Sequence, residues 1–121
     1  MVQNYKQLKI WKRSFQLAIE IYGLTNNFPK SEKYNLTAQL RRASTSISSN
    51  IAEGASKHTS VDFQRFLYQA YGSLKEVESL LMLSKELKYV LVRDFQPLAK
   101  EIDEIARMIY KFVEVVKKSW N

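Results

Sequence analysis

The chain is organised around residues 36–54, LTAQLRRASTSISSNIAEG. The apolar side chains of this stretch are spaced four, three, four and four residues apart, which places them on one face of an α-helix. Residues 44–49 include five Ser or Thr residues, which form helices poorly on their own but let neighbouring helices come close. We therefore expect a helix that its neighbours hold in place and that Gly54 ends in a left-handed C-cap. The predicted buried face consists of Leu36, Leu40, Ala43, Ile47 and Ile51.

Three more stretches repeat apolar residues at helical spacing, and polar or proline-containing segments separate them. Pro29 and Ser31 predict the start of the second helix, because proline fits the first helical turn. Thr59 and Asp62 have the spacing of a capping box, which predicts the start of the third. The chain thus predicts an all-α fold, an up-down-up-down antiparallel four-helix bundle with no strands. The predicted helices span residues 5–26, 30–54, 60–88 and 93–119.

Apolar residues on the first and third helices predict the core and the assembly. The third helix carries a second apolar flank with Tyr71 and Leu83, which suggests burial on more than one side and hence a homo-oligomer. The predicted core stripe of the first helix is Leu8, Trp11, Phe15, Ala18, Ile19 and Tyr22.

Composition bounds the class of protein. The 121 residues, 45% hydrophobic and 26% charged, fit a single globular domain over residues 1–121. There is no cysteine, so neither a disulfide framework nor a thiolate metal site is available. No apolar run is long enough for a signal peptide or a membrane span. We expect a cytoplasmic protein without a membrane partner.

Few residues offer catalytic chemistry. The one histidine, His58, lies in a predicted loop, and a di-iron bundle site needs histidines on two helices. The sequence has no glycine-rich loop that cradles phosphate. We therefore expect no enzyme, with no catalytic residue, cofactor or metal ion.

The basic residues are predicted to gather at one end of the bundle. The net charge is +7. An antiparallel bundle brings four segments to one end: the start of helix 1, the end of helix 2, the start of helix 3 and the end of helix 4. This end holds nine basic residues and three acidic ones. Such an end suits the phosphates of RNA or DNA, or it serves only as a solvated, lysine-rich end that aids solubility. Its nucleic-acid-binding candidates are Lys6, Lys9, Lys12, Arg13, Lys57, Lys111, Lys117 and Lys118, with Lys6, Lys9 and Arg13 on one helix face, and Arg65 adds to its charge.

Arg41 and Arg42, in the middle of helix 2, allow two interpretations. They can contact phosphate, or they can pair with acids such as Glu76 and Glu78 on helix 3 or with a neighbouring subunit. We favour the structural interpretation, because both lie beside a buried stripe.

The helix 2 motif resembles that of a known family. Residues 39–43, QLRRA, followed by Ser46-Ile47 and by residues 50–54, NIAEG, resemble the signature of the bacterial four helix bundle proteins. That family includes proteins encoded in intervening sequences of large-subunit ribosomal RNA genes, and it is similar to the accessory variability determinant of diversity-generating retroelements. Further matches are Trp11, Tyr22-Gly23-Leu24-Thr25, Phe28-Pro29, Phe66-Leu67 and Gly72-Ser73-Leu74-Lys75-Glu76.

The resemblance implies a homo-oligomer, typically a five-membered ring, and a structural or interface role for the motif. The retroelement relative binds nucleic acid and a reverse transcriptase, which makes RNA, DNA or such a protein a candidate partner here. We expect a non-enzymatic accessory factor with a basic surface that binds nucleic acid. The alternative is an oligomeric protein-interaction module. The motif residues with the implied role are Gln39, Arg41, Arg42, Ser46, Asn50, Glu53, Gly54 and Glu76.

Overall fold

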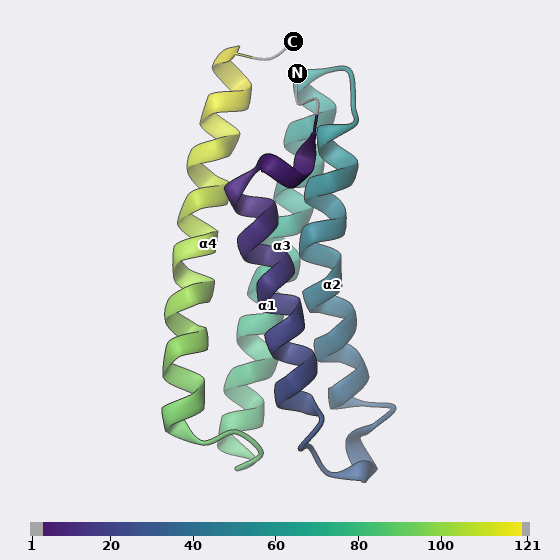
Figure 1. The fold of residues 1–121 in the computed structure, drawn as a ribbon, viewed down its shortest axis with the longest axis vertical. Coiled ribbons are helices and arrows are strands. Elements are labelled where there is room, and N and C mark those ends of the chain that lie inside the picture. The colour runs from purple at the N-terminus through teal and green to yellow at the C-terminus, as the bar shows by residue number, and fades with distance from the viewer. Residues whose placement is uncertain (1–3, 120–121) are drawn as a thin grey trace.

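The chain folds into four antiparallel helices, shown in Figure 1, in a computed structural model that describes residues 4–119. Each helix runs against its neighbour in the chain, and no strand occurs in the described residues. The predicted all-α four-helix bundle is confirmed. The elements are the short 3₁₀ turns η1 (Tyr5–Gln7) and η2 (Lys30–Glu32) and the helices α1 (Lys9–Thr25), α2 (Leu36–Ala55), α3 (Ser60–Glu86) and α4 (Val92–Ser119).

The predicted face of α2 lies at the centre of the core. Leu40, Ile47 and Ile51 are fully buried, and Leu36 and Ala43 are nearly so. This face belongs to one apolar cluster with the stripes of α3 and α4, and α2 itself packs along α3 and α1. The spacing of apolar residues in α2 therefore predicted its buried side correctly.

Gly54 does not end α2 in a left-handed cap, and that prediction is wrong. The helix continues to Ala55, and no glycine in the described residues has a positive φ. Instead Gly54 is buried where α2 meets α3. A Cβ atom at this position would lie 2.7 Å from Cβ of Phe66 and 3.1 Å from Cδ1 of Phe63, so only glycine lets the two helices approach this closely.

The start of α2 also differs from the prediction. Pro29 leads into the 3₁₀ turn η2 rather than into α2, which begins six residues later than expected. The Glu32 carboxylate accepts hydrogen bonds from Asn35 Nδ2 at 3.2 Å and from the Leu36 backbone N–H at 3.4 Å. The Glu32 side chain thus satisfies the first backbone N–H of α2. At α3, by contrast, Thr59 accepts from the Asp62 N–H at 3.2 Å, as the capping signal predicted.

The core face of α1 is not the predicted stripe. Phe15, Ile19 and Tyr22 are 46%, 52% and 43% exposed. The buried face of α1 is turned to one side of this stripe, and Ala18 is the one predicted member that it fully includes. Leu8, in extended conformation, separates η1 from α1, so the predicted helix 5–26 is broken near its start. The buried residues are Ile10, Ser14, Leu17, Ala18, Ile21 and Thr25.

The antiparallel order brings four segments to one end of the bundle. The starts of α1 and α3 and the ends of α2 and α4 lie at the top of Figure 1. Within residues 4–119, no helix is both long enough and apolar enough to cross a membrane.

Candidate nucleic-acid interface

The predicted basic end exists, with most of its lysines turned to solvent. Lys6, Lys9 and Lys12 are exposed near the start of α1. The prediction that Lys6 shares a helix face with Lys9 and Arg13 is wrong, because Lys6 lies in η1. Lys57, after α2, is half-buried with its Nζ 5.1 Å from the centre of the Phe66 ring.

Lysines of α4 complete this end. Lys111, Lys117 and Lys118 are exposed. Lys117 Nζ lies 3.4 Å from Glu114 Oε2, and this hydrogen bond raises the pKa of Lys117. Lys111 and Lys118 take part in no ion pair with any described residue.

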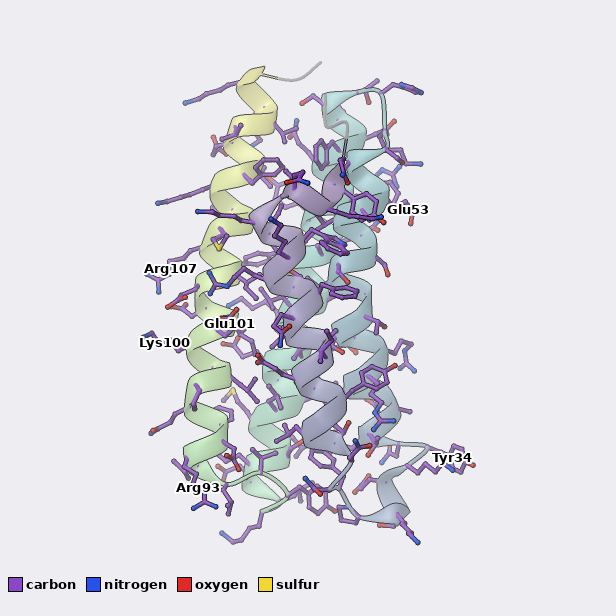
Figure 2. All side chains as sticks on the ribbon, in the orientation of Figure 1. Tyr34, Glu53, Arg93, Lys100, Glu101 and Arg107 are labelled. Atoms are coloured by element: carbon purple, nitrogen blue, oxygen red, sulfur yellow. The ribbon has the colours of Figure 1, made fainter. Side chains whose placement is uncertain are left out.

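Arg13 is committed to α4 rather than to a ligand. Its Nε lies 2.7 Å from Glu101 Oε2, and its Nη2 lies 2.7 Å from Glu101 Oε1 and 2.7 Å from Glu104 Oε1. Hydrogen bonds to Glu101 and then to Glu104 hold the pKa of Arg13 well above its usual range. Figure 2 shows Glu101 on the side of α4 that faces α1. Arg13 therefore joins two helices and is a poor phosphate ligand.

Arg41 binds the end of α1. Its Nε donates to Thr25 Oγ1 at 2.9 Å and its Nη2 to Asn26 Oδ1 at 3.0 Å, while the guanidinium carbon lies 4.6 Å from the centre of the Tyr22 ring. These partners are neutral, so the expected ion pair with Glu76 or Glu78 is not formed. Arg41 instead contacts α1 through hydrogen bonds to neutral acceptors and through its guanidinium group over the Tyr22 ring.

The motif residue Ser46 links α2 to α3, and Asn50 binds Ser46 within α2. Ser46 Oγ lies 2.8 Å from Ser73 Oγ, and Asn50 Nδ2 donates to Ser46 O at 2.8 Å and to Ser46 Oγ at 3.0 Å. Gln39 Nε2 donates to Asn35 Oδ1 at 2.8 Å, within the start of α2. The remaining charged motif residues, Arg42, Glu53 and Glu76, are exposed.

Three basic residues of α4 were absent from the predicted site. Arg93, Lys100 and Arg107 are exposed, and Figure 2 shows all three on the outer edge of α4. Their spacing of seven residues was the available signal, because two helical turns return a side chain to nearly the same face. They extend the basic surface beyond the predicted end.

Catalytic chemistry is sparse in the part of the chain that the structure describes. His58 is exposed in the connection after α2. Within residues 4–119, no group of three or more metal-ligating side chains comes together.

The surface has an apolar groove of about 350 Å³ between the start of α1 and the end of α4, with lysines at its rim. Its lining is Leu8, Lys9, Ile10, Met108, Lys111, Phe112 and Val115.

Comparisons with known proteins agree with the fold. A family model described as 23S rRNA-intervening sequence protein matches residues 6–111. The structure is similar to that of a protein of unknown function from the S23 ribosomal protein family of Bacteroides thetaiotaomicron, with a TM-score of 0.77 and 22% sequence identity over 86% of this chain and 97% of that one. At this identity the likeness shows the fold alone. Among curated proteins, none matches the chain.

Proposed function

Since the chain belongs to the 23S rRNA-intervening sequence protein family, we propose that it is a non-enzymatic accessory factor that assembles with copies of itself and binds RNA or DNA. The observation that carries the binding proposal is a set of exposed lysines and arginines at one end of the bundle and along α4. In the described residues most of them have no acidic partner, and the exceptions are Arg65, Arg107 and Lys117. The pairing of Arg13 with Glu101 and Glu104 supports it as well, because it neutralises two acids of α4 that then pair with no exposed lysine among the described residues.

Self-assembly is proposed to use the exposed side of α1. Trp11 stacks on Phe15 with ring centroids 4.7 Å apart, and Phe15, Ile19 and Tyr22 continue this apolar face along the helix. Contiguous exposed apolar side chains of this size are typical of contact surfaces. The neighbouring outer face of α2 carries small side chains such as Thr45, which let another helix come close. A second copy of the chain is the proposed occupant.

A closed ring explains how the basic ends would act together. The family resemblance points to five copies, and cyclic symmetry turns the same end of each subunit to the same side when the helices run along the ring axis. The result is a broad positive surface. Its contacts are mainly to phosphate, so binding is expected to depend weakly on sequence and strongly on salt.

The test is fluorescence anisotropy of labelled RNA and DNA over a range of salt concentrations. Lys9→Gln with Lys12→Gln should weaken binding to every sequence. It should also reduce the slope of log K against log salt concentration by about 0.7 to 0.9 for each lost phosphate contact. The matched control, Lys30→Gln with Lys33→Gln at the opposite end, should bind like the parent. If the parent binds neither RNA nor DNA at low salt, the proposal fails and the protein-interaction module replaces it. The apolar groove beside Lys9 and Lys111 is the feature that favours that alternative.

A further inference from the structure

Basic residues form a continuous stripe along the outer face of α4. Their spacings of seven, seven, four and seven residues keep them on one side of the helix over about 38 Å, at about 1.5 Å per residue. All are exposed, and Figure 2 shows the first three directed away from the bundle along its edge. We call this set the α4 stripe: Arg93, Lys100, Arg107, Lys111 and Lys118.

The acids of α4 leave the stripe largely uncompensated. Glu101 and Glu104 are held by Arg13 on the side facing α1. Glu114 pairs with Lys117, which lies off the stripe. Only Asp103 contacts a member of the stripe, through its ion pair with Arg107. Glu101 and Glu104 thus face α1, whereas Asp94, Asp103 and Glu114 are exposed like the basic residues of the stripe.

An aromatic groove opens beside the middle of the stripe, between α3 and α4. The rings of Tyr71 and Tyr110 lie 5.8 Å apart at 51°, and Lys75 Nζ lies 5.6 Å from the centre of the Tyr71 ring. Tyr110 is 61% exposed. The groove has a volume of about 430 Å³, and the stripe residues Arg107 and Lys111 line it together with Asp103, the ion-pair partner of Arg107. An exposed ring and a row of positive charges therefore share one site.

We propose that this site binds single-stranded nucleic acid, with phosphates along the α4 stripe and a base stacked on Tyr110. Sequence-tolerant single-strand binders combine a basic track with aromatic rings on which bases stack. A duplex keeps its bases stacked on one another, so it can use the charges but not the ring. An acidic protein segment likewise has carboxylates for the charges but no base for Tyr110. The inference rests on the proposed nucleic-acid function and narrows it to a strand type and a place.

The experiment measures anisotropy of labelled oligo(dT) and oligo(rU) and of a duplex with the same number of phosphates, using the full chain. Tyr110→Leu should weaken single-strand binding at least about fivefold, the low end of the loss of one base stack, and leave duplex binding unchanged. Tyr110→Phe keeps the ring face and should bind like the parent. The matched control is Tyr34→Leu, because Tyr34 is 88% exposed on the connection between α1 and α2.

The charges are tested with Lys100→Gln and Arg107→Gln together, since both residues lie outside the predicted basic end. This variant should flatten the salt dependence of single-strand binding by about 1.4, the value for two lost phosphate contacts. Circular dichroism of each variant checks that the helices remain.

The outcomes separate this inference from the broader function. If the parent binds no nucleic acid at low salt, the proposed function itself fails. If the parent binds but Tyr110→Leu and the double Gln variant bind equally well, the function stands and this site is wrong. Two further outcomes would overturn the proposed single-strand site. The parent protein would bind the duplex more tightly than the single strand, or a poly-glutamate peptide of equal charge would displace labelled oligo(dT) as well as unlabelled oligo(dT) does.

Discussion

The α1–α2 side of the bundle and the outer side of α4 have opposite chemistry. On α2, hydroxyl side chains turn back to the helix backbone, as when Ser44 and Thr45 both donate to the Arg41 carbonyl at 3.0 Å. On α1 beside it, Trp11 and Phe15 stack at the surface. The outer side of α4 instead carries long basic side chains. The first side suits contact with another protein surface, and the second suits a polyanion.

This difference shows how one helix can serve packing and another the surface. Hydroxyls bonded to their own backbone make α2 a weak helix alone, so its stability must come from burial of its apolar face. α4 is held in the bundle by both apolar and polar contacts. It buries an apolar stripe against α3, and it meets α1 less extensively, with Arg13 as the polar link.

The largest effect is expected in the core face of α2. Ile51→Ala, and likewise Ile47→Ala, should lower the free energy of unfolding by about 2–5 kcal/mol, because both side chains are fully buried. Chemical denaturation measures this loss. Thr45→Ala on the outer face of α2 is the control and should change stability by less than about 0.5 kcal/mol. A loss of that small size for Ile51→Ala would contradict the assigned core.

The next effect concerns the aromatic face of α1. Phe15→Glu with Ile19→Glu should convert the proposed oligomer to monomers, because charges cannot be buried without partners in an apolar contact. Light scattering gives the mass, and circular dichroism should show unchanged helices, since both residues are exposed in the single chain. Tyr34→Glu serves as the control. An unchanged oligomer mass in the double variant would place the contact elsewhere.

A smaller effect is expected where α1 and α4 are joined. Arg13→Gln should cost about 1–2 kcal/mol of stability, because it removes hydrogen bonds to two partly exposed carboxylates and leaves them close together. Arg107→Gln breaks an ion pair that is far more exposed and should cost less than about 0.5 kcal/mol. Thermal denaturation compares the two. Equal losses would remove the distinction between the linking arginine and the stripe arginine.

The smallest effect lies where the two sides meet at the other end of the bundle. The Tyr89 hydroxyl donates to Glu32 Oε2 at 2.9 Å, and this hydrogen bond raises the pKa of Tyr89 above 10.0. A raised pKa means that the neutral phenol stabilises the fold at pH below 10 and that this contribution is lost as pH rises through the folded-state value. Tyr89→Phe should remove this step from the stability–pH profile. If the step in the stability–pH profile persists in Tyr89→Phe, another titrating group causes it.

The sequence predicted the fold because period and chain order were sufficient for it. The face of α2 from Leu36 to Ile51 follows from spacing alone. The face of α1 does not, because Trp11, Phe15 and Tyr22 form one helical stripe and Ile10, Leu17 and Ile21 form another beside it. Only the position of α1 against its neighbours decides between them.

The site was less predictable because it depends on pairings across the bundle. Arg13 and Glu101 are 88 positions apart, and their contact needs the register of α1 against α4. Gly54 fits both a cap and a close helix contact, and the distance to Phe66 decides which. The α4 stripe was readable from its spacing, whereas the prediction grouped charges by bundle end rather than by helix face.

Assembly and nucleic-acid binding are proposed to use different sides of the molecule. Sedimentation velocity at low salt with labelled oligo(dT) tests this separation, because one run reports both the protein mass and the bound label. The variant with Lys100→Gln, Arg107→Gln and Tyr110→Leu should sediment as the same oligomer as the parent while most of the label stays free. If that variant sediments as a monomer, or if the label still travels with it as with the parent, the division between the two sides is wrong.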